Sequence, residues 1–394
     1  MNENPVSIVL AGIGGMGGVY VAELLVCARE GTFRIVGAAD PEPARCPRLE
    51  ELKALGIPIV PALEDFYARA EADLAVISSP IQFHASQTIL ALSHGSHVLC
   101  EKPLAATVRE AEAMREACVR SGRWVAVGYQ WSFSGAIQGL KKDILNGLLG
   151  KPKRMSCLYL WPRDEAYYAR NSWAGRIKDA DGRWVLDSPA NNAMAHDLHN
   201  MFYLLGKDIE GSARPAEVKA ELYRANRIEN YDTAAARIKT DNGVELLFLV
   251  SHAGRRDPGP VLSYEFERAT VLAAGRGSDI KALFYDGKVR NYGSPDAEPM
   301  KKLWDSIGAA RGGRPPVCGI EAASAQTIAA NAMQESSPAI TDFPAGLLRT
   351  EETAGSSRKW VEGLDEVLEL CYAESLLPSE AGVEWARPCR VLIL

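Results

Sequence analysis

A lysine at the end of a short apolar run is the first candidate for chemistry in this sequence. Residues 97–100 read as a buried strand, and Glu101-Lys102-Pro103 follows it with two charged side chains. Ligands of an open parallel sheet bind at the carboxyl ends of its strands. A lysine there can take the hydroxyl proton of an alcohol as hydride leaves, and can polarise a carbonyl in the reverse direction. An isolated lysine is more often solvated, so the role of Lys102 depends on its surroundings.

A glycine-rich turn near the start of the chain indicates a nucleotide site. Gly12-Ile13-Gly14-Gly15-Met16-Gly17 follows an apolar run at 6–11 and opens a helical pattern. In this fingerprint the first glycine permits a tight turn, the second lets a pyrophosphate approach the backbone, and the third allows close helix packing. Asp40 ends the next apolar run, where a carboxylate can accept hydrogen bonds from the adenosine ribose. These residues together predict a bound dinucleotide.

The charge of Asp40 bears on which dinucleotide binds. A carboxylate repels a 2'-phosphate, so NAD is favoured over NADP. Arg45 lies nearby in the sequence and could accommodate that phosphate, so NADP is not excluded.

The pattern of apolar runs and helical segments changes near residue 130, which predicts two domains. Up to residue 130, apolar runs alternate with helical patterns, which predicts a doubly wound parallel sheet of the Rossmann type over 1–130. The remaining strands of this part are expected at 34–39, 73–78 and 124–128. Its helices are expected at 20–29, 82–93 and 107–121.

From residue 131 onward β-rich runs predominate. Strands are expected at 154–161, 216–223, 233–240, 244–251, 263–272, 282–285 and 288–292. Asp-Asn-Gly at 241–243 and Asp-Gly at 286–287 favour hairpins. We therefore expect 131–394 to be an α+β domain for substrate binding and oligomerisation, a mostly antiparallel sheet with helices on one face. Its helices are expected at 136–148, 192–205 with Gly206 as the C-cap, 299–310, 320–335 and 356–372; the tail after Ser336 has no assigned function.

Composition excludes several classes of partner. The net charge of −6 and a pI near 5.7, without any Lys/Arg block, argue against nucleic acid and anionic membranes. Eight cysteines without a C-x-x-C pair are typical of reduced thiols in a cytoplasmic protein. Residues 1–5 lack a basic targeting segment, and no later segment approaches the roughly 20 apolar residues of a membrane span. A cytoplasmic, small-molecule role is expected.

Several motifs together make the sequence resemble the Gfo/Idh/MocA family of glucose-fructose oxidoreductase and inositol dehydrogenase. They are the glycine turn, Ser79-Pro80, His84 and Glu101-Lys102-Pro103; the similarity runs through 78–105 and continues at 195–206. The resemblance implies a two-domain, oligomeric NAD(P)-dependent enzyme, here expected as a homodimer or homotetramer. It adds Ser79, Pro80, His84, Glu101 and Lys102 to the cofactor-binding residues and makes Lys102 catalytic.

Two histidines lie three residues apart on the helix expected at 192–205, and therefore on one face. Histidines in such positions are often core residues. The resemblance places a proton-transferring histidine at His196 and an acid three residues later, where this chain has His199. Asp187 or Asp197 could substitute for that acid. A metal pair is another interpretation, but no H-E-x-x-H pattern or third ligand accompanies the histidines, and we expect no metal.

Aromatic, arginine and asparagine side chains gather in the sequence around the expected mouth of the site. Aromatic faces can pack on the C–H surfaces of a sugar while polar groups meet its hydroxyls. An ordinary loop over a domain interface is an equal alternative. The expected substrate-binding residues are Tyr129, Trp131, Trp161, Arg163, Arg170, Trp173, Asp187 and His199.

These patterns predict an NAD-dependent oxidoreductase. It would transfer hydride between the nicotinamide and a secondary alcohol or ketone of a sugar, sugar derivative or cyclic polyol. Two alternatives stay open on the same scaffold: an NAD-dependent glycosidase that uses transient oxidation, and a non-catalytic cofactor-binding sensor.

Overall fold

The computed structural model describes residues 5–27, 31–337, 339–353 and 355–394. The chain divides into two compact units: the first is 1–133 with 298–324, and the second is 134–297 with 325–394. The single boundary expected at 130 differs from this division, because the buried Leu303 and Ile307 of a late helix pack in the first unit. The start of the chain at 1–4 and the expected helix end at 28–29 lie outside the described residues.

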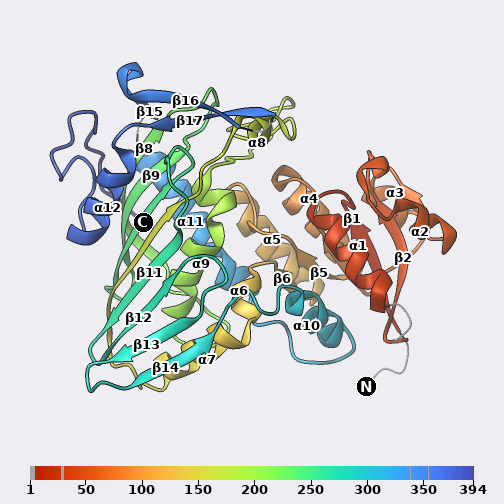
Figure 1. The fold of residues 1–394 in the computed structure, drawn as a ribbon. Coiled ribbons are helices and arrows are strands. Elements are labelled where there is room, and N and C mark those ends of the chain that lie inside the picture. The colour runs from red at the N-terminus through yellow and green to blue at the C-terminus, as the bar shows by residue number, and fades with distance from the viewer. Residues whose placement is uncertain (1–4, 28–30, 338, 354) are drawn as a thin grey trace. The chain divides into compact units, whose positions relative to one another are not determined.

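The sheet of the first unit confirms the predicted Rossmann architecture (Figure 1). Its six strands have the order β3-β2-β1-β4-β5-β6, and every pair is parallel. The chain moves outward from β1 in both directions, so the point where the strand order reverses lies between β1 and β4. The strands are β1 (Val6–Ala11), β2 (Phe33–Ala39), β3 (Ile59–Val60), β4 (Leu74–Ile77), β5 (His97–Cys100) and β6 (Val125–Val127).

Capping residues in the sequence set both ends of helix α5 in the first unit. In α5, Thr107 and Glu110 form a reciprocal capping box, and Gly122 at φ +65° closes the helix. Trp304 of α10 donates its ring N–H to Glu23 of α1 at 2.9 Å, which joins the late helix to the first one. The helices are α1 (Met16–Cys27), α2 (Leu49–Ala54), α3 (Leu63–Tyr67), α4 (Ile81–Ser93), α5 (Val108–Ser121), α6 (Gln130–Phe133) and α10 (Lys301–Ala310), with a 3-10 turn at Pro43–Arg45.

The second unit is built on a ten-stranded sheet, as expected mostly antiparallel. The parallel pair β7–β10 brings two carboxyl ends to one edge of it. The order is β14-β13-β12-β11-β7-β10-β9-β8-β15, and β18 also pairs with β8. The strands are β7 (Pro152–Leu160), β8 (Pro215–Arg224), β9 (Thr233–Thr240), β10 (Glu245–Ser251), β11 (Gly259–Phe266), β12 (Ala269–Ala274), β13 (Ile280–Phe284), β14 (Val289–Gly293), β15 (Thr341–Asp342) and β18 (Leu392–Ile393).

Three expected elements of the second unit are interrupted by local backbone geometry. The strand expected at 263–272 is the hairpin β11–β12, whose apolar alternation continues across the turn. The helix expected at 356–372 is β17 (Ser356–Val361), paired with β16 (Leu348–Thr353), followed by α12 (Leu364–Glu374). Gly363 at φ +77° separates them.

The helix expected at 192–205 divides in the same way. A π-helical turn (Pro189–Ala193) precedes α9 (Ala195–Leu204). The C-cap of α9 is Leu205, so the prediction of Gly206 as the cap is wrong. Gly206 is required for a different reason, because a Cβ there would lie 2.1 Å from the carbonyl oxygen of Gly211.

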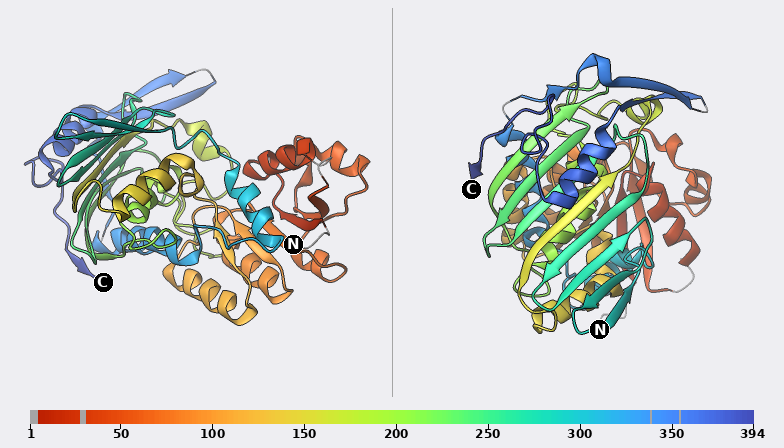
Figure 2. Two further views of the ribbon diagram at one scale, coloured as in Figure 1. Left: turned by 90° about the horizontal axis from the view of Figure 1, so that it is seen from below. Right: turned by 60° about the vertical axis from the view of Figure 1, so that its left-hand side comes forward.

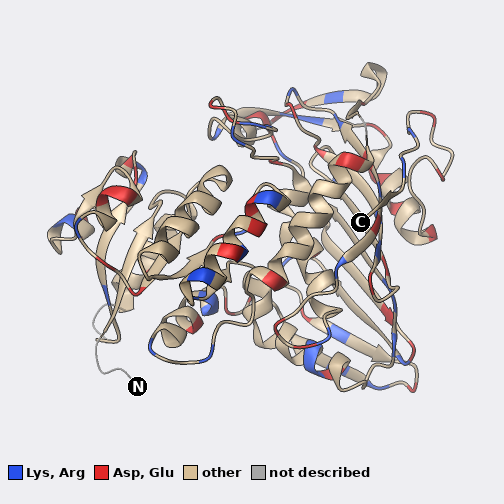
Figure 3. Ribbon diagram, turned by 180° about the vertical axis from the view of Figure 1, so that it is seen from behind, with Lys and Arg blue, Asp and Glu red and all other residues tan. Residues whose placement is uncertain are grey.

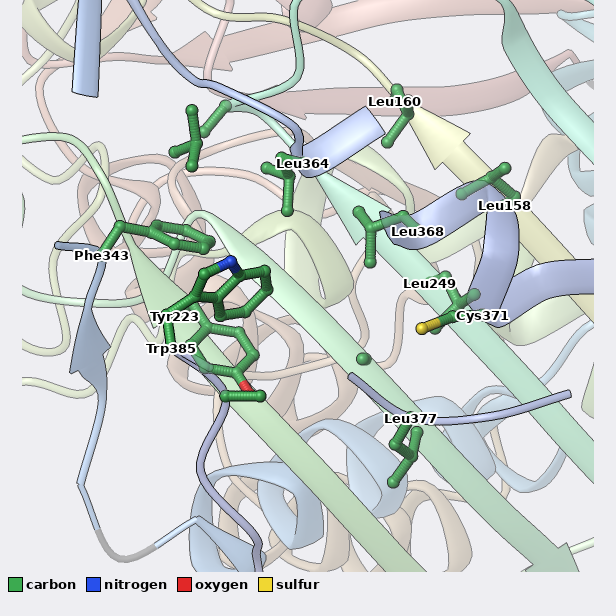
Figure 4. Packing of buried hydrophobic residues seen from close by; sticks show 14 of the residues in the cluster. Leu158, Leu160, Tyr223, Leu249, Phe343, Leu364, Leu368, Cys371, Leu377 and Trp385 are labelled. Carbon is green, nitrogen blue, oxygen red and sulfur yellow. The ribbon is translucent and has the colours of Figure 1, made fainter. Parts of the chain in front are cut away.

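Helices lie on both faces of the second sheet. The remaining ones are α7 (Gly135–Leu145), α8 (Glu165–Ala169) and α11 (Ile320–Ser336). Figure 2 shows α12 on the face opposite to α9. On the α12 face, the rings of Tyr223, Phe343 and Trp385 pack with centroids 4.9 to 5.4 Å apart (Figure 4). The tail after Ser336 therefore completes a hydrophobic core.

Charged residues are interspersed along both units (Figure 3). No helix in the described part of the chain is long and apolar enough to cross a membrane. No disulfide joins the eight cysteines.

Candidate functional site

The glycine turn is locked against the loop that follows β4. A Cβ on Gly12, which has φ +79°, would lie 2.8 Å from the backbone nitrogen of Ser79, and a Cβ on Gly17 would lie 2.1 Å from the Gly12 oxygen. Ser78 Oγ donates to that same Gly12 oxygen at 2.8 Å. A Cβ on Gly15 would meet nothing within 4 Å. The turn is thus tight on its inner side and open on its outer side, at the N-terminus of α1, where anions bind favourably.

Asp40 connects the end of β2 to the glycine turn. Its Oδ2 accepts the Ile13 N–H at 2.8 Å, and its Oδ1 accepts the Glu42 N–H at 2.7 Å. Arg45 lies close to the turn, and its Nε pairs with Glu42 at 2.7 Å. This ion pair is exposed and therefore weak. The Asp40 carboxylate, which would repel a 2'-phosphate, favours NAD.

His84 holds two loops of the sheet edge together. It is 1% exposed, and its ring nitrogens lie 2.8 Å from the Pro103 oxygen and 2.9 Å from the Ser79 oxygen. Ser79 Oγ donates to Gln87, and Pro80 is the N-cap of α4. His84 thus positions the loops after β4 and β5, and a direct cofactor contact by its side chain stays a prediction.

Glu101 is the centre of a buried network that the sequence did not predict. Its Oε1 accepts the hydroxyl of Tyr20 at 2.6 Å and pairs with Lys302 of α10. Lys302, 1% exposed, also donates to the Gly128 oxygen at 3.3 Å. Burial alone would raise the pKa of Glu101, but the Lys302 charge and the hydrogen bonds from Lys302 and Tyr20 lower it.

The same carboxylate fixes the backbone of Lys102. Glu101 Oε2 accepts the Lys102 N–H at 3.1 Å, and the following peptide to Pro103 is cis. Lys102 itself is half-buried directly after β5. Glu101 therefore positions Lys102, and its carboxylate is occupied by protein groups rather than turned toward solvent.

The carboxyl edge of the first sheet gathers most of the predicted residues of this unit. The glycine turn follows β1, Asp40 follows β2, Ser79-Pro80 follows β4 and Glu101-Lys102 follows β5. Tyr129 and Trp131 follow β6, but Tyr129 is completely buried and Trp131 is only 9% exposed. Substrate contact by these two aromatic residues stays a prediction.

In the second unit, four of the predicted residues form one stack with a tyrosine. The Arg163 guanidinium lies 3.7 Å from the ring centroid of Trp161 and 4.4 Å from that of Tyr167. The Arg170 guanidinium lies 3.7 Å from Tyr167 and 5.4 Å from Trp173. These five residues, which we call the arginine-aromatic cluster, follow the carboxyl end of β7 and surround α8.

Asp187 fixes the loop that follows this cluster. It is 3% exposed; its Oδ2 accepts the Gly175 N–H at 2.6 Å, and its Oδ1 accepts an amide N–H of Asn192 at 2.7 Å. Asn192 belongs to the π-helical turn that precedes α9, and His196 is the second residue of α9. Asp187 therefore positions the loop and the start of α9. A substrate contact by Asp187 stays a prediction.

The predicted pair on α9 has two different environments. His196 is half-buried. His199 is 1% exposed beside Tyr203, and burial, with the charge of Lys141, lowers its pKa to about 3. Asp197 is 2% exposed, and burial raises its pKa to about 7. His199 is thus a neutral interior residue, and its contact with substrate stays a prediction.

Within the ranges that the structure describes, no three His, Cys, Asp or Glu side chains are arranged to hold an ion.

Comparison with known sequences agrees with this geometry. Residues 6–129 match the family GFO_IDH_MocA, an oxidoreductase family with an NAD-binding Rossmann fold. A 1-carboxy-3-chloro-3,4-dihydroxycyclohexa-1,5-diene dehydrogenase of Comamonas testosteroni is 29% identical over 36% of this chain and 35% of its own length. A 2,7-anhydro-N-acetylneuraminate hydratase of Mediterraneibacter gnavus is 29% identical over 47% of this chain and 45% of its own length. The chain thus spans less than half the length of these relatives.

Solved structures share the fold over both units. The WlbA dehydrogenase of Bordetella pertussis, in complex with NADH and UDP-GlcNAcA, matches with a TM-score of 0.69 and 22% identity. The match covers 84% of this chain and 96% of that one. Residues 6–129 of this chain therefore match the NAD-binding Rossmann fold of the Gfo/Idh/MocA oxidoreductase family.

Proposed function

We propose that this chain transfers hydride between NAD and a secondary alcohol or ketone of a sugar, sugar derivative or cyclic polyol. One observation carries the proposal: Lys102, a proton-transferring type of residue, lies at the same sheet edge as the glycine turn and Asp40. The point where the strand order reverses lies at this edge, where ligands of doubly wound sheets bind.

The residues at this edge fit NAD. The open outer side of the glycine turn and the N-terminus of α1 would meet the pyrophosphate, and Asp40 would accept hydrogen bonds from the adenosine ribose. NAD, when bound, supplies the hydride acceptor for alcohol oxidation. The chain supplies the remaining functions, which are orientation of the substrate and handling of its proton.

We propose that Lys102 Nζ accepts the proton of the reacting hydroxyl during oxidation. Glu101 holds the Lys102 backbone, and the His196 imidazole is the second proton-transferring group. The second unit would bind the substrate through Trp161, Arg163, Arg170 and Trp173. Because Asp197 is a carboxyl with a pKa of about 7 next to His196, it is our candidate for the acid that His199 does not provide.

We also propose that the protein is a cytoplasmic homodimer or homotetramer, with subunit contacts on the second sheet. Supporting this, Leu272, Leu283 and Val289 are exposed on the strands β12 to β14. Exposed apolar side chains that lie together often mark protein interfaces.

A second candidate reaction keeps the oxidation step but has no net redox change. The relative named as a hydratase motivates it, and a glycosidase that uses transient oxidation belongs to the same class. In this case product forms without accumulation of NADH. A sensor without turnover is the remaining alternative.

Replacement of the catalytic lysine tests the proposal. We expect Lys102→Met to keep NAD affinity by calorimetry and to lower turnover of a sugar and polyol panel about 10²- to 10⁴-fold, the range of a lost acid-base group. Lys53→Met, on the exposed surface of α2, is the matched control and should retain full activity. Undiminished turnover by the Lys102 variant would overturn the assignment.

A further inference from the structure

Two arginines of the arginine-aromatic cluster lack a carboxylate partner among the described residues. Arg163 has its guanidinium against two rings, and its Nε is buried without a hydrogen-bond acceptor there. Arg170 donates to the Tyr167 backbone oxygen at 2.5 Å. No ion pair of either arginine lies within the ranges that the structure describes. The cluster therefore holds two positive charges near one tyrosine ring.

Neighbouring arginines of the same unit have carboxylate partners. Arg276 also lies over Trp161, at 4.6 Å, but its guanidinium bonds both oxygens of Asp257 at 2.7 and 2.9 Å. Arg176, in the following loop, pairs with Glu229 at 2.8 Å. Stacking on an aromatic ring thus does not by itself explain why Arg163 and Arg170 lack a counter-charge.

The charge of Arg163, which is partly buried, is costly for the chain alone, whereas Arg170 is exposed. Burial lowers the pKa of Arg163, and the charge of Arg170 lowers it further, while nearby tyrosines oppose the shift. Cation–π contacts compensate such charges only in part. Asp187, a nearby acid, is bonded by Gly175 and Asn192. An anion between the two arginines would relieve their repulsion.

We propose that Arg163 and Arg170 bind an anionic group of the substrate, a carboxylate or a phosphate, so that this site selects acidic sugars over neutral ones. The inference rests on the proposed function and narrows its substrate class. The rings of Trp161 and Tyr167 pack against the guanidinium of Arg163, so hydrogen bonds from its terminal N–H groups would run in the guanidinium plane. That is the geometry in which a guanidinium binds carboxylate or phosphate with two hydrogen bonds.

Direct binding tests the selection without requiring turnover. D-glucose, D-glucuronate and D-glucose 6-phosphate are titrated by calorimetry into the full-length protein saturated with NAD. We expect one of the two acids to bind about 10- to 100-fold more tightly than D-glucose, as two charge-assisted hydrogen bonds allow. The two acid arms distinguish a carboxylate ligand from a phosphate ligand.

Variants assign the effect to the cluster. Arg163→Met should abolish the preference for the acid, and Arg163→Lys should restore part of it. Arg170→Met, at an exposed position, tests the same claim if Arg163→Met does not fold. The matched control is Arg255→Met, which removes a guanidinium lying 4.9 Å from the Trp360 ring, outside the cluster, and should keep the preference.

The outcomes separate this inference from the proposed function. Equal affinity for all three sugars, or a preference that survives Arg163→Met and Arg170→Met, overturns the inference. Oxidation of neutral sugars in that case leaves the proposed function in place. An acid preference that depends on Arg163, without hydride transfer from any sugar, supports the anion site and counts against the oxidoreductase.

Discussion

Removal of the Lys302 charge should destabilise the first unit and disturb the Lys102 turn. In Lys302→Met, Glu101 stays buried, and among the described residues Tyr20 and the Lys102 N–H remain as its hydrogen-bond donors. Loss of one partner of a buried ion pair costs about 3 to 5 kcal/mol. We expect the free energy of unfolding to fall by about that amount at pH 8, because an uncompensated carboxylate remains in the interior.

The pH dependence identifies the cause of this loss. In the native chain the pKa of Glu101 is lowered, so its contribution to stability is present above the ordinary value of 4.5 and is lost as the pH falls through the folded pKa. Without Lys302, burial raises the pKa instead, so the variant loses stability as the pH rises above 4.5. The difference between the two proteins should therefore grow from pH 5 to pH 8.

Urea unfolding of the native chain and the variants at both pH values measures these differences. Lys301→Met is the matched control, because that half-exposed lysine pairs with Asp305 at 2.6 Å on the same helix, and its loss should cost less than about 1 kcal/mol. Adding Glu101→Gln to Lys302→Met should recover much of the loss. A destabilisation below about 1 kcal/mol at pH 8, or one independent of pH, would refute the reasoning.

Three further variants test other parts of the structure. Asp197→Asn should be more stable than the native chain at pH 8, by up to about 4 kcal/mol at ~1.4 kcal/mol per pKa unit. Because the pKa of Asp197 is about 7 in the native chain, the stability of the native chain falls as the pH rises from about 4 to 7. In thermal unfolding the stability advantage of Asp197→Asn should therefore vanish near pH 4. An advantage that is independent of pH would contradict the account. Gly17→Ala should abolish NAD binding in calorimetry, because the new Cβ would overlap the Gly12 oxygen. The control variant Gly308→Ala, which has open space around the new Cβ, should bind NAD normally. NAD binding by Gly17→Ala would contradict the turn geometry. Trp385→Ala should lower the urea stability of the second unit by about 3 to 5 kcal/mol, and an unchanged midpoint would show that the tail is not part of its core.

The first sheet was predictable because its signals are local. The glycine turn, Asp40 and the Glu101-Lys102 pair each end an apolar run, and parallel strands bring their carboxyl ends to one edge. Lys302 was not predictable in this way, because it lies 201 residues from Glu101. The sequence feature that could have indicated its role is a lysine next to Leu303 on the apolar side of a helix, because a lysine buried there needs a partner.

The second unit was predictable as strands but less well as a site. Arg163, Arg170, Trp161 and Trp173 were chosen by residue type, and the structure brings them into one cluster. That Arg163 and Arg170 have no carboxylate partner in the described part of the chain follows only from the three-dimensional arrangement. The environment of His199 was also hidden, because helical spacing gives the face of a residue but not whether that face is the interior.

Transfer of deuterium to the cofactor tests the central claim most directly. The purified chain is incubated with NAD and a panel of neutral and acidic sugars and polyols that carry deuterium at their secondary carbinol carbons, and the nicotinamide is analysed by mass spectrometry. The account predicts reduced cofactor that carries one deuterium, formed by the native chain and strongly diminished in Lys102→Met. Bound NAD that gains no deuterium from any member of the panel would contradict it.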